Sequence, residues 1–406
     1  MAESATPAAP VLSPRAVRLI LLALALGGFA IGTSEFVVMG LIREIAQSLG
    51  VDEPRVGHVI SAYALGVVVG APLIAVLAAR VARFALLVLL LGLFAVGNGL
   101  SALAPNYEAM LVFRFLSGLP HGAYFGVAAL VAASLVGPER RAFAVSRVML
   151  GLTVATVIGV PLANWIGQMA GWRWGFAIVA LLGLATVALV ALFAPRDRAQ
   201  PGASPLGELG ALKLPQVWLT LGIGAIGFGG LFAVYTYLAS TLMEVTGVGA
   251  AAVPLVLCVF GLGMVAGNLI VPCFADRALM PTAGGLLLWS AAGLALFPLA
   301  ALNVWTAAAD VFLIGMGGAL GTVLQVRLME VAKDSQSLAA ALHHSAFNAA
   351  NALGPWLGGM AIAGGYGWTS TGWVGCGLAL GGFAIWAVSL LAEQAHGRRA
   401  ELCPAE

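Results

Sequence analysis

Two charged side chains lie inside long apolar stretches of the sequence, where an ionised group is costly. Glu35 occurs in Gly-Thr-Ser-Glu-Phe at residues 32–36, late in an apolar run over residues 17–40. Arg114 lies in another run, over residues 108–133, and is the only basic residue well inside such a run. If these runs cross a membrane, a central acid costs about 2.5–3.5 kcal/mol, so it is expected to face a protein interior or a wet cavity and to have a partner.

The depths of Glu35 and Arg114 match if the two runs are membrane helices of opposite direction. Glu35 lies five residues before the end of its run, and Arg114 lies six residues after the start of its own. The sequence therefore predicts an ion pair, in which the guanidinium favours the ionised carboxylate. If the pair can break, Glu35 can take up a proton and release it elsewhere, as proton-coupled transport requires. A permanent structural pair is the alternative.

The composition is that of an integral membrane protein. Charged residues are 9% of the 406 residues, and AVILMFWYC residues are 61%. Soluble domains carry about a quarter charged residues. A membrane span needs about 20 apolar residues. Twelve runs qualify, at residues 17–40, 56–79, 84–104, 108–133, 143–166, 173–194, 217–241, 252–276, 281–302, 305–330, 338–364 and 370–392. We therefore expect an all-α membrane protein with twelve transmembrane helices.

Basic residues gather at one end of the predicted helices. If the N-terminus is inside, fifteen lie in cytoplasmic segments, and only Arg43, Arg55 and Arg173 lie outside. An excess of Lys and Arg marks the cytoplasmic side, so both termini are predicted to be cytoplasmic. The prolines and charges of the longest connection indicate a central linker. The predicted parts are a disordered N-terminus (1–16), a six-helix bundle (17–194), the linker (195–216), a second bundle (217–392) and a tail (393–406).

The two predicted bundles repeat each other at offsets of 194 to 197 residues. The segment from Gly70 to Arg80 corresponds to the segment from Gly267 to Arg277. Gly171-Trp172 corresponds to Gly367-Trp368, and Gly159-Val-Pro161 corresponds to Gly354-Pro355. A duplicated six-helix unit, with halves related by an axis along the membrane normal, is a transporter architecture. Its substrate site lies near the midplane between the halves.

Further polar side chains at membrane depth are candidates for substrate contact. His121 follows Pro120 near the midplane of its run. His344, Asn348 and Asn351 share one face of a predicted helix, because residues about four apart on a helix are neighbours. A lipid-facing stripe of this kind would be costly, so it should face a cavity or another helix. Hydrogen bonding between helices is the alternative to substrate contact for all four. His121 could also be a second proton site, because histidine titrates near neutral pH.

Two tyrosines and an acid complete the predicted substrate contacts. Tyr63 and Tyr235 offer rings with hydroxyl tips, which suit the mostly apolar sites that bind small molecules. Asp310 lies at a depth that mirrors Arg114 in the second bundle. It could bind a cationic substrate or a proton, or lie at a wet outer rim.

The sequence lacks the motifs of several other classes of protein. Neither of the two lysines follows a glycine, so no Walker A loop exists and ATP-driven transport by this chain is excluded. No Ser/His/Asp elbow, HExxH or strand-linked GxGxxG occurs, which argues against a membrane-embedded enzyme, and no basic run suggests a nucleic-acid partner. The four cysteines show neither CxxC spacing nor neighbouring histidines, so we expect no metal site.

Several motifs resemble those of the major facilitator superfamily. They are Gly32–Phe36, Tyr63–Pro72, Arg114–Gly126, Gly151–Pro161 (similar to the antiporter motif), and Ser345–Asn348 with Asn351–Pro355. The chain most resembles the twelve-helix drug:proton antiporter branch, and within it the bacterial sugar efflux and chloramphenicol resistance permeases.

The resemblance implies a monomer in the bacterial inner membrane that exports a small organic solute, such as a sugar or chloramphenicol, by alternating access. The proton gradient would drive export without a cofactor. The alternative is a uniporter or a proton-coupled uptake permease of the same fold, for a sugar or nucleoside.

The resemblance also indicates gating residues. Arg80 and Arg83 follow the second predicted helix, Asp276 and Arg277 occupy the corresponding place in the second bundle, and Gly159 and Pro161 lie in the antiporter-like motif. The family's first loop usually carries an Asp before its basic residues, but this sequence has Ala79 there. The usual charge latch of the first bundle is therefore incomplete, although Arg80 could meet carbonyl groups at a helix C-terminus.

Overall fold

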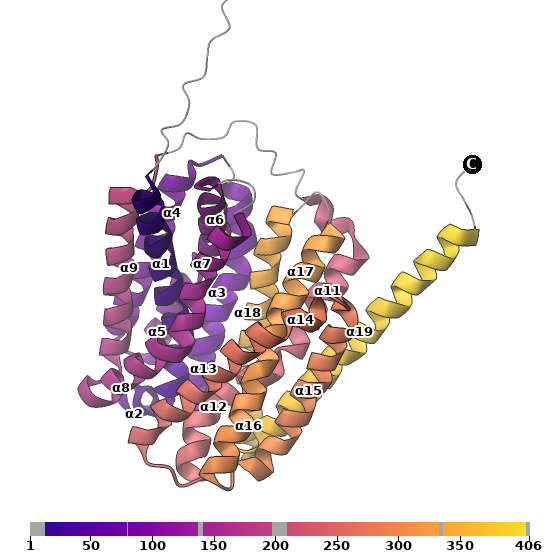
Figure 1. Cartoon of the computed structure of the whole chain (residues 1–406). Coiled ribbons are helices and arrows are strands. Elements are labelled where there is room, and N and C mark those ends of the chain that lie inside the picture. The colour runs from indigo at the N-terminus through magenta and orange to yellow at the C-terminus, as the bar shows by residue number, and fades with distance from the viewer. Residues whose placement is uncertain (1–12, 79, 137–140, 197–208, 333–335, 403–406) are drawn as a thin grey trace, which may run out of the picture.

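The structure is a computed structural model that describes residues 13–78, 80–136, 141–196, 209–332 and 336–402. Every regular element within these ranges is a helix. Two groups of helices, one from each half of the chain, stand side by side (Figure 1). Ala79, most of the predicted N-terminal segment, the middle of the predicted linker and the last four residues lie outside the described residues.

The first half contains ten helical elements within the described residues. They are α1 (Pro14–Gly40), α2 (Ile42–Leu49), α3 (Glu53–Leu77), α4 (Arg83–Ala102), α5 (Tyr107–Gly118), α6 (His121–Ser134), α7 (Arg141–Val154), η2 (Ala155–Gly159), α8 (Val160–Ala170) and α9 (Arg173–Phe193).

The second half is built in the same way. Its elements are η3 (Leu209–Lys213), α11 (Pro215–Gly227), α12 (Gly229–Glu244), η4 (Ala250–Ala252), α13 (Val253–Ile270), α14 (Pro272–Ala275), α15 (Leu279–Ala300), α16 (Val304–Met316), η5 (Gly317–Ala319), α17 (Leu320–Ala332), α18 (Gln336–Ala361), η6 (Ile362–Tyr366) and α19 (Ser370–Leu402).

The predicted all-α membrane fold is confirmed. Eleven helices within the described ranges are long and apolar enough to cross a membrane. A twelfth, α18, is 26 residues long and packs along α3. It is less apolar than the others because it carries the predicted stripe of His344, Asn348 and Asn351 beside His343.

Several spans are interrupted where the sequence contains proline or glycine. Pro120 separates α5 from α6, and Pro161 follows the π-helical turn η2. A proline lacks the backbone N–H that an uninterrupted helix would use, and π-turns often occur at functional sites. Gly159 closes η2, where a Cβ atom would collide with Thr33 of α1. The predicted gating pair Gly159 and Pro161 therefore lies at an irregular turn packed closely on α1.

The apolar cores differ between the two ends of the molecule. We call the end with α2 and the turn between α4 and α5 the α2 end. The opposite end, where α1 and α11 begin, is the linker end. The largest buried cluster joins the second half to first-half residues of the α2 end, such as Phe36, Ile60 and Trp172. Toward the linker end, the first half has a separate cluster around Leu24 and Leu87, and the second half has a small one that includes Leu221, Leu328 and Ala339.

Candidate functional site

Arg114 is fully buried in the first half and is held by neutral groups. Its two terminal nitrogens donate hydrogen bonds to the side-chain and backbone oxygens of Ser34, each at 3.0 Å. The Ser34 hydroxyl donates in turn to Oδ1 of Asn98 at 2.6 Å. The guanidinium carbon lies 4.2 Å from the centre of the Tyr63 ring, within the range of a cation–π contact. Dipoles and an aromatic face thus surround this buried charge.

The predicted ion pair between Glu35 and Arg114 is not formed in this conformation. Glu35 instead accepts a hydrogen bond of 3.0 Å from the side-chain amide of Asn351, which belongs to α18 of the second half. The reason is helical geometry: neighbouring residues on a helix point about 100° apart. Ser34 therefore faces α4 and α5, whereas Glu35 faces the second half.

The contact between Glu35 and Asn351 crosses the interface between the halves. Glu35 is 6% exposed and Asn351 is fully buried. Oδ1 of Asn351 has no hydrogen-bond partner among the described residues. An ionised carboxylate accepts a strong charge-assisted bond from the amide. A protonated carboxyl could instead donate to the free Oδ1, so the two protonation states of Glu35 use different atoms of the Asn351 amide.

Histidines from both halves meet next to this contact. Nδ1 of His121 shares a 3.0 Å hydrogen bond with the Tyr63 hydroxyl. The imidazoles of His121 and His344 lie 6.0 Å apart between centroids, and His344 stacks on Phe125 at 5.3 Å. Within the described parts of the chain, no group of three or more His, Cys, Asp or Glu side chains could hold a metal ion. His121, His344, Tyr63 and Phe125 thus form one cluster of polar and aromatic groups where the halves meet.

The structure brings only some of the predicted substrate residues together. Glu35, Tyr63, His121, His344 and Asn351 form one polar band between the halves, with Arg114 at its first-half end. Asn348 lies on the same helix, but its amide donates to the backbone carbonyl of His344 at 3.0 Å.

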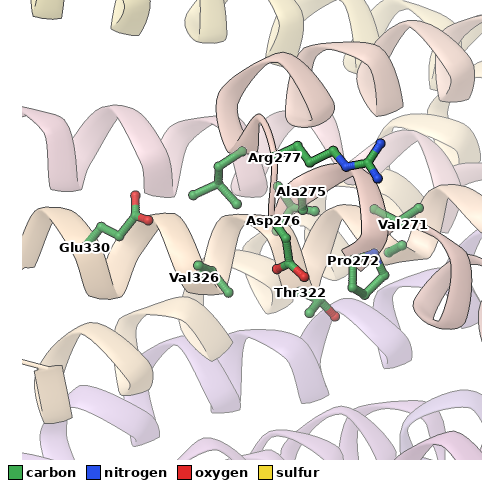
Figure 2. Close-up of a pocket in the computed structure, with 11 residues that line it drawn as sticks. Val271, Pro272, Ala275, Asp276, Arg277, Thr322, Val326 and Glu330 are labelled. Carbon is green, nitrogen blue, oxygen red and sulfur yellow. The ribbon is translucent and has the colours of Figure 1, made fainter.

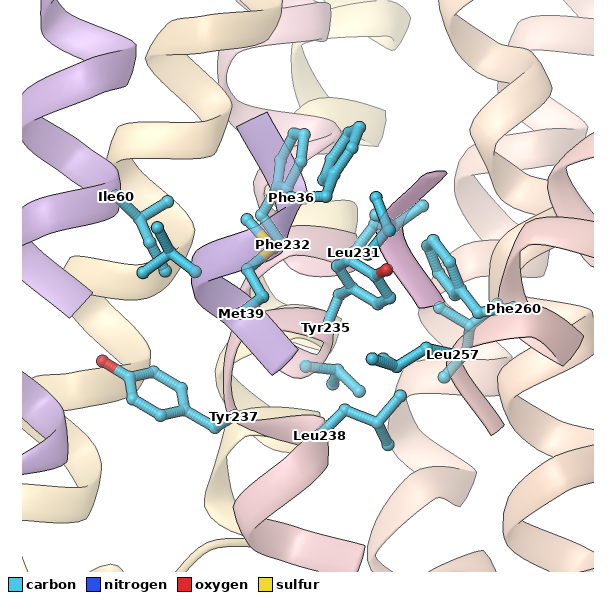
Figure 3. Close-up of a cluster of buried hydrophobic side chains, with 14 of the residues drawn as sticks. Phe36, Met39, Ile60, Leu231, Phe232, Tyr235, Tyr237, Leu238, Leu257 and Phe260 are labelled. Atoms are coloured by element: carbon cyan, nitrogen blue, oxygen red, sulfur yellow. The ribbon is translucent and has the colours of Figure 1, made fainter. Parts of the chain in front are cut away.

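Tyr235 occupies an apolar junction instead of this polar band. Its ring stacks on Phe260 at 4.1 Å and meets the edge of Phe36 at 5.8 Å. Figure 3 shows these rings packed with the surrounding aliphatic side chains where α1 meets α12 and α13. Tyr235 therefore helps to join the halves.

Asp310 has the depth of Arg114 but does not correspond to it in the packing. Gly66 packs against the carbonyl of Phe115, and Gly263 packs against that of Phe312, an offset of 197 residues. At this offset the counterpart of Arg114 is Val311. Asp310 is rotated by one residue, and Oδ1 lies near Gly293 of α15. It is thus separated from the polar band.

The predicted gating residues of the two loops, unlike Gly159 and Pro161, lie at the linker end. Arg80 is an exposed residue of the turn before α4, and Arg83 begins α4. Asp276 and Arg277 line a cavity of about 310 Å³ in the second half, with Thr322, Val326 and Glu330 of α17 (Figure 2). Ala79, where the family pattern has an acid, lies outside the described residues.

At the α2 end, polar contacts between the halves were not predicted. Nη1 of Arg43 on α2 pairs with Glu244 at the end of α12, at 2.7 Å. The hydroxyl of Ser240 donates to Glu53, which begins α3. The sequence predicts only that Arg43 lies on the outer side of the membrane, because a single sequence does not indicate which loops face each other.

Comparisons with known proteins agree with this architecture. The model of the Major Facilitator Superfamily matches residues 24–329. The inner membrane transport protein YdhP of Escherichia coli K12 is 40% identical over 86% of this chain and 90% of its own. A chloramphenicol resistance protein of Streptomyces lividans is 34% identical over 82% of this chain and 86% of its own. The crystal structure of a mutant of the nucleoside transporter NupG shares the fold, with a TM-score of 0.69, 15% identity and coverage of 92% and 99%. Because the family model spans most of the chain and YdhP matches nearly its full length, the chain belongs to the major facilitator superfamily, a family of transporters and not of enzymes.

Proposed function

We propose that this protein exports a small organic solute in exchange for protons, by alternating access, with Glu35 as the coupling acid. The observation that carries the proposal is the hydrogen bond from Asn351 to Glu35 across the two halves. A titratable group at this place can link proton binding to the movement of one half against the other.

The cycle follows from the chemistry of the Glu35 carboxyl. While the α2 end is open, Glu35 takes a proton from the outside. The neutral carboxyl can then be buried against Asn351, where it accepts a hydrogen bond from the amide nitrogen and donates one to Oδ1. Closing the α2 end gives the described conformation. Opening of the linker end lets the proton leave toward the cytoplasm and lets solute enter. Inward movement of each proton through the membrane potential supplies about 2.3 kcal/mol per 100 mV.

Separate observations support the direction of transport and the class of solute. The excess of basic residues at the linker end supports a cytoplasmic location for that end, and so for both termini. The chloramphenicol resistance protein among the relatives supports export of a drug, and the motif resemblance described above supports a sugar as the other candidate. Tyr63, His121, His344, Asn348 and Asn351 are the proposed solute contacts, with the protein acting as a monomer.

We propose two groups of gating residues, one at the π-turn and one at the linker end. The π-turn at Gly159 and Pro161 would let α7 and α8 bend against α1. At the linker end, Asp276 and Arg277 would make and break contacts when the halves close there. Arg80 and Arg83 are the corresponding residues of the first half.

A uniporter or a proton-coupled uptake permease is the second candidate. It is favoured by the neutral partners of Arg114, which could hold the site together permanently without a role for proton binding. In that case the contact between Glu35 and Asn351 would be structural.

The test is solute-driven proton movement in liposomes that contain the purified full-length protein and a pH-sensitive dye. An arabinose-like sugar, chloramphenicol and a nucleoside are each added to wild type, to Glu35→Gln and to Glu108→Gln. Glu108 is an exposed acid in the first turn of α5 and serves as the matched control. We expect one solute to move protons in wild type and in Glu108→Gln but not in Glu35→Gln. Transport without a proton signal, or normal coupling in Glu35→Gln, would show that Glu35 is structural.

A further inference from the structure

Asp310 is a buried acid that the proposed cycle does not use. It lies six residues after the start of α16 and is 2% exposed. Neither of its carboxylate oxygens has a hydrogen-bond partner among the described residues. An isolated ionised carboxylate is the most costly group to bury in an apolar region, and the neutral acid is far less costly.

Among the described residues, the helices packed on α16 offer no charge that could replace the proton of Asp310. Helix α15, which packs on α16, has no titratable side chain, and α13 has only Cys258. Helix α12 has Tyr235, Tyr237 and Glu244, and each has other contacts. Tyr235 stacks on Phe260, Tyr237 donates to the carbonyl of Pro355, and Glu244 pairs with Arg43.

Arg114 in the first half is a buried charge that, unlike Asp310, has partners that stabilise its ionised form. Arg114 makes two hydrogen bonds to α1 and an aromatic contact with α3. In the packing register set by Gly66 and Gly263, the place of Tyr63 is taken by Phe260. The second half thus keeps the packing of the first while omitting the groups that would stabilise a charge.

We propose that Asp310 is a second proton-binding site, separate from Glu35, and that it is occupied in the described conformation. Because it is buried beside Gly293 of α15 and makes no hydrogen bond with the polar band among the described residues, we assign it a proton and not the solute. Because it lies toward the α2 end of α16, its proton exchanges when the contact between α15 and α16 loosens at that end.

The experiment is infrared spectroscopy of the full-length protein in lipid, which needs no solute and is therefore independent of the proposed export. The carboxylic acid C=O band is recorded from acidic to alkaline pH in Glu35→Gln, where the band of that acid is absent, and in Glu35→Gln with Asp310→Asn. Glu35→Gln with Glu108→Gln is the matched control. We expect a band from a buried acid that disappears reversibly at alkaline pH, is unchanged in the control and is lost with Asp310→Asn.

Three outcomes would overturn the proposal. The band can be absent at neutral pH, it can persist in the Asp310→Asn protein, or it can fail to titrate over the pH range in which the protein remains folded. Asn resembles the neutral acid in shape and should fold. If it does not, Asp310→Glu provides the second variant, in which the band must shift in position for the proposal to stand.

Discussion

The two ends of the molecule join the halves in different ways. At the α2 end, Phe36 of α1 packs on Phe232 and Tyr235 of α12, in one buried cluster shared by both halves (Figure 3). Toward the linker end, the buried clusters around Leu24 and Leu221 belong to separate halves. The pair of Arg43 and Glu244 also links the halves at the α2 end, whereas nearer the linker end the hydroxyl of Ser345 on α18 donates to the carbonyl of Val68 on α3.

This difference identifies the described conformation as one that is closed at the α2 end. The polar band with Glu35 and His121 lies between the buried cluster that both halves share and the separate clusters nearer the linker end. For alternating access, the joined end must open at a cost that proton or solute binding can offset. Changes that weaken the joined end should therefore shift the population of conformations, and their effects can be ranked.

The largest effect is expected from Gly261→Leu. Gly261 of α13 packs against η2 of the other half, and a Cβ atom there would lie 2.7 Å from the carbonyl oxygen of Thr156. Because the obstacle is backbone, the helices must separate. Overpacking costs about 1–3 kcal/mol, and each 1.4 kcal/mol is about tenfold in population. We expect spin-label distances between α2 and the end of α12 to lengthen.

Gly92→Leu provides the matched control for that substitution. Gly92 is also in a membrane helix, but a Cβ atom there meets nothing within 4 Å. The distances in this control should equal those of wild type. If Gly261→Leu also leaves them unchanged, the contact between α13 and η2 does not hold the halves together.

The next effect is expected from Asn351→Ala, which removes the donor to Glu35. A buried acceptor left without its hydrogen bond costs about 1–3 kcal/mol, and the effect should be greatest at pH values where Glu35 is ionised. The same spin-label distances measured against pH would show the closed population falling as pH rises. Asn348→Ala is the control, because its amide donates only within α18. An equal response of the two variants would contradict a special role for Asn351.

A smaller effect is expected from the exposed ion pair at the α2 end. The side chains of Arg43 and Glu244 are 38% and 44% exposed. Exposed pairs contribute about 0.2–1 kcal/mol, and salt weakens them. A double-mutant cycle with Arg43→Ala and Glu244→Ala, read from the same distances, should give a coupling in this range that falls at high salt. A coupling that is insensitive to salt would mean that the pair acts through packing.

The sequence predicted the helices well and their contacts only in part. Hydropathy sets the spans, and the polar stripe correctly indicated that Asn351 and His344 face other helices. Depth alone could not choose between Ser34 and Glu35 as the partner of Arg114, because neighbouring residues share a depth but not a face. The same limit made Asp310 look like the counterpart of Arg114. Which residue faces which helix depends on packing, as the glycine contacts of α13 and α16 show.

The smallest effect is expected from Glu44→Gln on α2, outside the membrane spans. Burial raises the pKa of Glu44 above its ordinary value of 4.5, and a backbone hydrogen bond and the charge of Arg43 offset this only in part. A raised pKa means that the neutral form favours the docked helix, so stability is full below about pH 4.5 and is lost as the pH rises through the folded-state value. Glutamine stays neutral throughout.

The melting temperature of Glu44→Gln should therefore match wild type at acidic pH and exceed it slightly at neutral pH. The increment is small because Glu44 is only partly buried and solvent screens its charge. Glu108→Gln is the control, because it removes an acid that lies outside the contact made by α2. A difference that does not change with pH, or that favours wild type at neutral pH, would show that the charge on Glu44 does not oppose the docking of α2.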